Sequence, residues 1–243
     1  MPSVLILGAT SDIGFAIARK FASEKYAVQL AARNVDQLKT FQSDIEIRYS
    51  VPCSVYDFDA NKFDTHEEFY NSLGSKPDVT VYVIGYMQDN EAALKDWNES
   101  LKTINANYAG AVSILNIIAN DYATKQKGTI VGISSVAGNR GRQSNFIYGS
   151  AKAAFTAYLS GLRNKLYHNK VHVVTVLPGF VYTKMTEHLK LPKLLTATPE
   201  EVANEVYNGV KKKRNVVYVK WFWKWIMRII TSIPEPMFKK KKL

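Results

Sequence analysis

The chain has few of the residues from which disulfides and metal centres are built. It contains one cysteine, Cys53, and four histidines that do not cluster in the sequence. An internal disulfide is therefore excluded, and the spacing offers no metal site. A signal-peptide pattern is also missing, because an apolar strand pattern already begins at Ser3. These absences favour a cytoplasmic protein without a metal.

Internal repeats, linkers and low-complexity stretches are missing before residue 220. A chain of 243 residues can bury a full core as one domain. Apolar strand patterns alternate with helical ones, which predicts an α/β domain over residues 1–219, with a doubly wound parallel sheet and helices on both faces. We expect about seven strands, near residues 3–8, 27–32, 46–50, 79–85, 128–134, 171–177 and 216–219.

Positive charge is confined to one end of the chain. From Lys211 onward, eleven Lys and Arg residues face one acid, Glu235, whereas the first 210 residues carry 21 Lys and Arg against 20 acids. The first 210 residues are therefore almost neutral, at +1, and residues 211–243 carry +10 of the net charge of +11.

The tail, residues 220–243, combines this charge with aromatic residues. Lys220, Lys224 and Arg228 recur at every fourth position of an apolar segment, so a helix over 221–230 would carry a cationic stripe. Charge at this spacing prevents a bilayer-spanning helix. We expect an amphipathic helix that lies on an anionic membrane surface. A dimer-interface helix that covers the partner's pocket is the alternative, and nucleic-acid binding is disfavoured because the basic residues flank a hydrophobic helix.

The N-terminal segment fits a dinucleotide-binding turn. An apolar strand ends at Gly8, and Thr10, Ser11, Asp12, Ile13 and Gly14 lead into an amphipathic helix. Glycine lets the backbone approach a pyrophosphate, and a helix N-terminus provides unpaired N–H groups. An ordinary strand, turn and helix is the alternative, but a second strand follows, as a Rossmann unit requires.

The end of the second strand bears on the choice of cofactor. Ala32 stands where an acid would bind a ribose 2′-hydroxyl, and Arg33 follows it. A cation suits a 2′-phosphate, so the pattern favours NADPH over NADH. The alternative is an exposed arginine that only opens the next helix.

Tyr148 and Lys152 are spaced for proton transfer. They share one helix face, where the ammonium should lower the pKa of the phenol. Ser135 ends an apolar strand upstream, where its hydroxyl could hold a substrate oxygen. The Tyr-x-x-x-Lys spacing alone occurs by chance in many helices, so its meaning depends on the other motifs.

Together these motifs resemble the short-chain dehydrogenase/reductase family along nearly the whole chain. The resemblance implies a tetrad in which Asn107 organises water, Ser135 orients a carbonyl, Tyr148 donates the proton and Lys152 lowers its pKa and holds the nicotinamide ribose. It also implies that Gly85 lies against the cofactor and that the loop holding Pro178, Gly179, Val181 and Thr183 meets the nicotinamide carboxamide. Members commonly form dimers and tetramers through helices that begin here near Lys102 and Phe146, so a homo-oligomer is expected.

Three positions depart from the family pattern. Leu7 replaces the usual Thr, Asp12 the middle glycine, and Tyr82-Val-Ile-Gly85 the usual Asn-Asn-Ala-Gly. We expect Asp12 to cap a helix that begins at Ile13. Loss of the Asn pair should remove side-chain hydrogen bonds between the fourth strand and its neighbours.

Other segments resemble one branch of the family, the decaprenylphosphoryl-2-keto-ribose reductases. By family position Asp57 and Phe58 should flank the adenine, and His66 should make a helix-start contact. Arg140 and Arg142 lie between the Ser135 strand and the Tyr148 helix, so they should rim the pocket, where arginine could clamp a phosphodiester. Two solvated loop arginines are an equally good interpretation.

The sequence thus predicts an NADPH-dependent carbonyl reductase that acts on an amphiphilic ketone, such as a lipid-linked keto-sugar, and lies in the cytoplasm or on the inner face of the membrane. The alternatives are a reductase of an unrelated lipid ketone and a catalytically silent NADPH-binding protein recruited to membranes.

Overall fold

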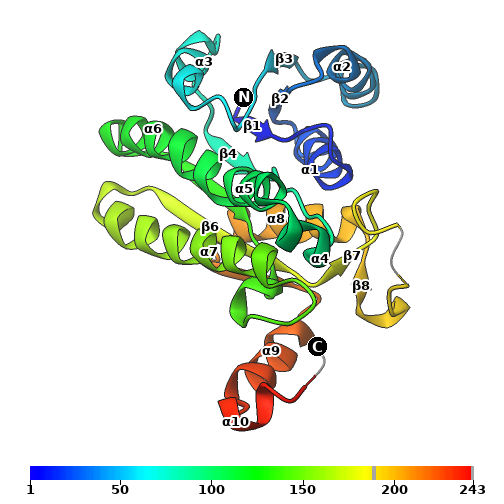
Figure 1. Cartoon of the computed structure of the whole chain (residues 1–243). Coiled ribbons are helices and arrows are strands. Elements are labelled where there is room, and N and C mark those ends of the chain that lie inside the picture. Colours follow the sequence, from blue (N-terminus) through cyan, green and yellow to red (C-terminus); the bar gives the residue numbers. More distant parts are fainter. Residues whose placement is uncertain (188–189, 242–243) are drawn as a thin grey trace.

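The computed structural model describes residues 1–187 and 190–241. At the centre of this part of the chain, seven parallel strands form one sheet in the order β3-β2-β1-β4-β5-β6-β9 (Figure 1). This confirms the predicted doubly wound sheet. The strands are β1 Ser3–Leu7, β2 Ala27–Ala32, β3 Cys53–Asp57, β4 Val79–Tyr82, β5 Thr129–Ile133, β6 His172–Pro178 and β9 Val216–Val219.

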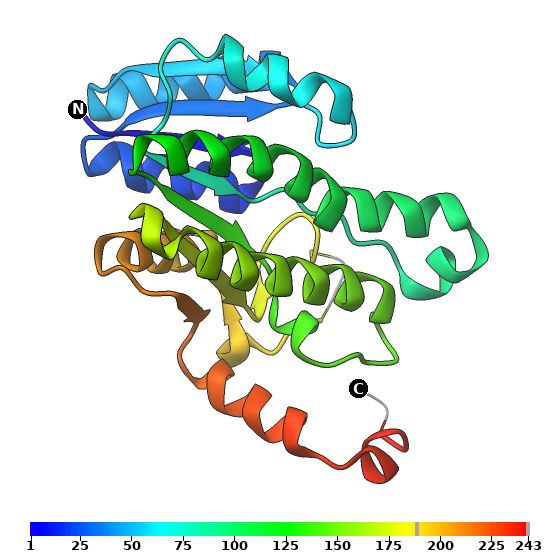
Figure 2. The ribbon, with the colours of Figure 1, turned by 90° about the vertical axis from the view of Figure 1, so that its left-hand side faces the viewer.

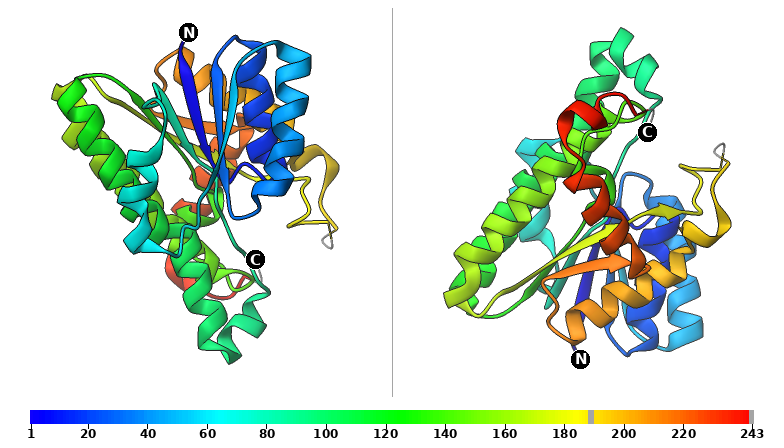
Figure 3. Two further views of the ribbon diagram at one scale, coloured as in Figure 1. Left: turned by 90° about the horizontal axis from the view of Figure 1, so that it is seen from above. Right: turned by 90° about the horizontal axis from the view of Figure 1, so that it is seen from below.

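Helices cover both faces of the sheet (Figure 3). Strand β1 shows why: it is buried throughout, and Val4 and Ile6 pack into one core cluster while Leu5 and Leu7 pack into the other. The first cluster lies under α1 Asp12–Ser23, α2 Val35–Tyr49 and α8 Pro199–Lys211. The second lies under α3 His66–Ser72, α6 Gly110–Lys125 and α7 Phe146–Leu166.

Shorter elements surround the carboxyl ends of the strands. They include the helices α4 and α5, a π-helical segment before α6, a two-stranded sheet of β7 and β8, and the tail helices α9 and α10. Their bounds are α4 Asn90–Lys95, α5 Trp97–Ile104, the π segment Asn105–Ala109, β7 Phe180–Val181, β8 Thr196–Ala197, α9 Phe222–Ser232 and α10 Glu235–Phe238.

The predicted strand at 46–50 is wrong. Helix α2 continues to Tyr49 and ends at Ser50, whose φ of 53° is left-handed, and the third strand follows at 53–57. Ile45, Ile47 and Tyr49 alternate as a strand would, but Ile45 is fully buried and Ile47 is 82% exposed. The stripe that packs on the core is Phe41, Ile45 and Tyr49, which has helical spacing.

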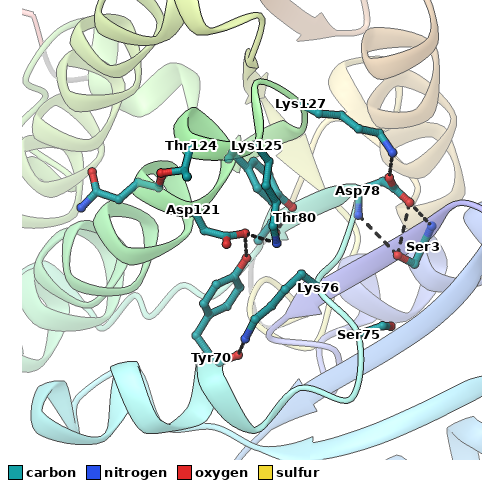
Figure 4. Close-up of polar contacts among 12 residues, drawn as sticks. Ser3, Tyr70, Ser75, Lys76, Asp78, Thr80, Asp121, Thr124, Lys125 and Lys127 are labelled. Atoms are coloured by element: carbon teal, nitrogen blue, oxygen red, sulfur yellow. Dashed lines mark hydrogen bonds and ion pairs between the residues drawn. The ribbon is translucent and has the colours of Figure 1, made fainter.

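Polar side chains fasten the amino ends of the strands (Figure 4). The Asp78 carboxylate, just before β4, accepts from the backbone N–H of Ser3 at 3.0 Å and pairs with Lys127 at 2.5 Å. At the other end of β4, the buried Tyr82 hydroxyl donates to the carbonyl of Ala106 at 2.9 Å. Strand β4 is therefore tied to its neighbours although it lacks the family's Asn pair.

The tail is docked on the domain and forms part of its surface. Helix α9 leaves the edge strand β9 and runs toward the loop between β5 and α7 (Figure 2). Trp223 and Met227 are 4% and 1% exposed and pack against Val136 and Leu177. The predicted helix thus exists, shifted to 222–232. Among the described residues, no helix is both long and apolar enough to cross a bilayer.

Candidate active site

A cavity of about 540 Å³ lies at the carboxyl ends of the strands. The strand order of the sheet reverses its direction between β1 and β4. Such a switch point is where open α/β sheets bind ligands. The cavity brings together most of the residues singled out in the sequence: Gly8, Thr10, Ser11, Asp12, Ile13, Arg33, Phe58, Gly85, Ser135, Arg142, Tyr148, Lys152, Pro178, Gly179, Val181 and Thr183.

The turn after β1 has the shape of a phosphate cradle. Gly8 has a φ of 102°, and a Cβ there would lie 2.8 Å from Cγ1 of Ile84. A Cβ on Gly14 would lie 2.4 Å from the carbonyl oxygen of Gly8, so this second glycine lets the helix start pack against the turn. Both glycines are therefore required by geometry, and the N-terminus of α1 opens beside the cavity.

The cap of α1 is Ser11, so the prediction that Asp12 caps a helix beginning at Ile13 is wrong. The Ser11 hydroxyl oxygen accepts from the N–H of Gly14 at 3.1 Å, and Asp12 is the first residue of the helix. Its carboxylate accepts from the backbone N–H of Lys184 at 2.8 Å. Asp12 thus fastens the loop after β7 over the cavity.

The adenosine end of the cavity has a cation where the sequence predicted one. Arg33 is exposed, follows β2 directly and lines the cavity. Phe58 is 3% exposed and lines the same end, whereas Asp57 ends β3 with its side chain exposed. His66 is fully buried beside Phe58, where its Nδ1 lies 2.8 Å from the Ser113 hydroxyl. His66 therefore links the start of α3 to α6.

The serine and the tyrosine meet at the closed part of the cavity. Ser135 follows β5 and lines the cavity together with Tyr148, near enough for its hydroxyl to favour a lower pKa of the phenol. Gly138 makes this approach possible, because a Cβ there would lie 2.7 Å from the backbone nitrogen of Ala153 in α7. The neighbouring Ser134 hydroxyl donates to the carbonyl of Lys152 at 3.0 Å, which fixes β5 against α7.

Burial governs the ionisation of Tyr148 and Lys152. It raises the pKa of Tyr148 to about 12, and the nearby Ser135 hydroxyl offsets this in part. Burial lowers the pKa of Lys152 to about 7. The Lys152 ammonium donates to the carbonyl of Ile133 at 3.0 Å. Desolvation dominates the pKa of both groups in this structure, and the effect of Lys152 on the pKa of Tyr148 stays a prediction. At neutral pH Tyr148 is a protonated phenol.

Asn107 lies behind the cavity wall. It is fully buried in the π-helical segment, and its amide donates to the carbonyls of Tyr86 at 2.5 Å and Thr103 at 2.8 Å. A Cβ on Gly85 would lie 3.2 Å from the Asn107 side-chain oxygen and 3.7 Å from the Lys152 ammonium. The asparagine is therefore held near Lys152. Single-turn π segments of this kind are frequent at functional sites.

The loop after β6 forms the opposite wall. Pro178, Gly179, Val181 and Thr183 line the cavity together with Trp223 from α9. A Cβ on Gly179 would lie 2.0 Å from the Trp223 ring, so the glycine is required by the tail helix. The indole N–H donates to the carbonyl of Leu195 at 3.1 Å.

Arg140 serves the tail, and its predicted place at the pocket rim is wrong. Its guanidinium donates to the carbonyls of Ile230 at 2.9 Å and Ile233 at 2.5 Å, at the C-terminal end of α9. It also pairs with Glu235 at 2.9 Å and lies 3.7 Å from the ring centroid of Phe238. Unpaired carbonyls at a helix end attract cations, which explains why the arginine turns this way.

Arg142 does reach the cavity. Among the described residues its Nε is buried without a hydrogen-bond partner, and so is the side-chain oxygen of Asn145 on the same wall. Burial lowers the pKa of the Arg142 guanidinium, although arginine stays charged at neutral pH. In total the cavity is lined by five cations and two acids: Arg33, Lys102, Arg142, Lys152 and Lys184 against Asp12 and Asp59.

Residues 2–193 match the family model described as short chain dehydrogenase. The chain belongs to this family.

Similar proteins of this family are named as oxidoreductases or dehydrogenases. An uncharacterised oxidoreductase of Mycobacterium tuberculosis is 33% identical over 90% of this chain and 88% of its own. Another, from Streptomyces coelicolor, is 30% identical over 98% and 95%. A short-chain dehydrogenase from Sphingobium yanoikuyae, solved in complex with NADPH, superposes with a TM-score of 0.83 at 20% identity over 97% of both chains. The protein is thus an oxidoreductase of the short-chain dehydrogenase family. These relatives are not named as keto-ribose reductases, so they do not support the resemblance to that branch.

Sequence reasoning missed Trp223, Asn145 and Ser134 in this short-chain dehydrogenase. Trp223 lies beyond the matched segment, in the tail for which the sequence predicts a helix on a membrane surface. Its four-residue spacing to Met227 was the available signal, since it places both on one face of α9.

Proposed function

We propose that this protein is an NADPH-dependent carbonyl reductase. The observation that carries the proposal is that Ser135, a protonated Tyr148 and Lys152 line one cavity beside the glycine turn after β1. Arg33 at the end of β2 supports a 2′-phosphate. The NADPH bound by the Sphingobium enzyme is in keeping with this choice.

When bound, NADPH supplies a hydride to the carbonyl carbon. The chain's residues handle the oxygen and the proton. Ser135 donates a hydrogen bond to the carbonyl oxygen, and Tyr148 transfers its proton to that oxygen as charge develops. A phenol with a pKa of about 12 holds its proton at neutral pH, which suits the reducing direction.

Lys152, Asn107 and the glycine cradle support this step. Lys152 is held by the Ile133 carbonyl beneath Tyr148, 5.8 Å from the centroid of its ring, where its ammonium faces the cofactor ribose in the family pattern. Asn107 is fixed by two carbonyls and lies, like Lys152, against Gly85, and we assign it to proton resupply.

We further propose that the substrate is an amphiphilic ketone with an anionic group, of the kind that a lipid-linked keto-sugar phosphate represents. Arg142 supports this, because a buried guanidinium nitrogen without a partner is costly unless a ligand accepts its hydrogen bond. The side-chain oxygen of Asn145 on the same wall offers an acceptor for a sugar hydroxyl. A plain acyl ketone would leave both groups unpaired.

Tyr148→Phe tests the reaction, with Tyr158→Phe as the matched control. Tyr158 lies on the same helix, and its hydroxyl donates to Asn116 outside the cavity at 2.9 Å. Loss of the general acid should lower turnover about 10²- to 10⁴-fold while NADPH still binds, as fluorescence titration can show. Turnover within threefold of wild type would contradict the assignment of Tyr148.

Arg142→Gln tests the substrate class separately. KM for a keto-pentose phosphate should rise about 10- to 100-fold, because a charge-assisted hydrogen bond is lost, and KM for a neutral cyclic ketone should hardly change. Equal effects on the two ketones would remove the anionic substrate from the proposal and leave the reductase intact.

A further inference from the structure

The outward side of α9 exposes large apolar residues beside cations. Trp221, Trp225 and Ile229 are 73%, 52% and 66% exposed, at every fourth position. Lys224 and Arg228 are also exposed and lie along one flank of this row. We call these five residues the outer face of α9. An apolar row of this kind on the surface of a domain marks a contact surface.

The outer face is held in a fixed orientation. The opposite side of α9 is buried through Trp223 and Met227, and Arg140 anchors the helix end. Trp221 is the N-cap of the helix, and only Lys220 separates it from the edge strand β9. Helix α9 is therefore fixed at both ends. Its exposed tryptophans could not enter the domain's own core unless the helix first left its place.

The charge around the outer face is of one sign. Lys239, Lys240 and Lys241 follow α10 and are exposed. The tail's one acid, Glu235, already pairs with Arg140 at 2.9 Å. The tail's excess positive charge is thus left to attract an anionic partner.

We propose that the outer face of α9 docks on a bilayer that contains anionic lipid. Tryptophan rings favour the boundary between headgroups and acyl chains, and lysines beside them bind anionic headgroups. A second copy fits less well, since an isologous contact would bring Lys224 and Arg228 against their own copies. Nucleic acid fits less well because the centre of the face is apolar.

Docking in this manner would place the cavity next to the lipid. Trp223 belongs both to α9 and to the cavity wall, and its indole donates to Leu195 in the turn that follows the cavity loop. The preceding residue, Leu194, is 79% exposed. Together with the proposed function, on which this step alone rests, the arrangement would deliver an amphiphilic ketone from the membrane surface.

Vesicle co-sedimentation of the full chain tests the proposal without any turnover. The probes are vesicles of phosphatidylcholine alone and of phosphatidylcholine mixed with phosphatidylglycerol. The wild-type protein should bind the anionic vesicles at low salt, lose binding as salt rises, and bind the neutral vesicles much more weakly.

Two variants carry the test. Ile229→Glu should lower binding at least about tenfold, whereas Ile47→Glu, at an 82% exposed position on α2, should not. The double variant Lys224→Glu with Arg228→Glu should lower vesicle binding by about fivefold or more for each cation replaced. The double variant Lys62→Glu with Lys165→Glu is the control with the same change of charge, and its effect should be much smaller.

Sedimentation velocity and circular dichroism complete the experiment. The variants should keep the wild-type fold and mass. If Ile229→Glu instead reduces an oligomer to a smaller species, the outer face is a subunit contact and the proposal is overturned. Wild-type protein that ignores anionic vesicles at low salt overturns it as well, whether or not the reductase assignment holds.

Discussion

Replacing Arg140 should release the tail from the domain. The guanidinium makes charge-assisted hydrogen bonds to the carbonyls of Ile230 and Ile233, and such bonds contribute about 1.5–3 kcal/mol each when buried. The pair with Glu235 adds at most about 1 kcal/mol, because that carboxylate is 73% exposed. Contact with the Phe238 ring adds about 0.5–1 kcal/mol. Since these groups are partly solvated and share one side chain, we expect Arg140→Gln to cost about 3 kcal/mol.

Hydrogen exchange of the backbone in residues 222–238 measures this directly. A loss of about 3 kcal/mol corresponds to about 100-fold faster exchange through local opening of α9, while the sheet strands keep their protection. Arg140→Lys should fall between wild type and Arg140→Gln, because it keeps the charge and loses the fork of donors. Arg48→Gln is the control, since Arg48 pairs with Asp44 on α2, away from the tail. Unchanged exchange in the tail of Arg140→Gln would refute the anchor.

Three further predictions follow from the site and the core. Arg33→Asp should shift the ratio of NADPH to NADH affinity toward NADH by at least about tenfold, and an unchanged ratio in fluorescence titrations would show that Arg33 is only a surface residue. Lys152→Met should raise the melting temperature more at pH 6 than at pH 9. Its folded pKa of about 7 lies below the unfolded value, so the cost of the buried charge is complete below pH 7 and declines as pH rises; an equal gain at both values would contradict this. Cys53, 5% exposed and with its pKa raised to about 12 by burial and Glu46, should resist iodoacetamide at pH 8 until the protein unfolds, and rapid labelling of folded protein would refute it.

Local patterns were enough to predict most of the sheet and the place of the catalytic group. Buried parallel strands are continuous apolar runs, so six of the seven strands could be located, and Gly8, Ser135 and Tyr148 stand at their ends or on the next helix. The third strand was misplaced because Ile45 and Ile47 alternate at the end of a helix, and tertiary packing decided between the two periods.

Other outcomes depended on contacts between distant residues. Arg140 and Ile230 are 90 positions apart, so nothing local indicates that the arginine caps α9. Asp12 accepts a hydrogen bond from Lys184, 172 positions away. The local sequence predicts a helix cap at Asp12, but this distant contact makes it hold the cavity loop instead. The pKa of Tyr148 also escaped prediction, since the spacing to Lys152 shows the nearby charge but not the desolvation that outweighs it.

The contact between Trp223 and Gly179 has a consequence for how the enzyme is made. The turn at Gly8 precedes the rest of the cavity in the chain, and the Trp223 indole that closes one wall follows β9, the seventh strand of the sheet. A nascent chain that has completed the sheet through β6 still exposes the inner surface of that wall. A closed pocket therefore forms only after α9 has been synthesised, and a product clipped between β9 and α9 would keep its sheet and its dinucleotide turn but not a closed pocket.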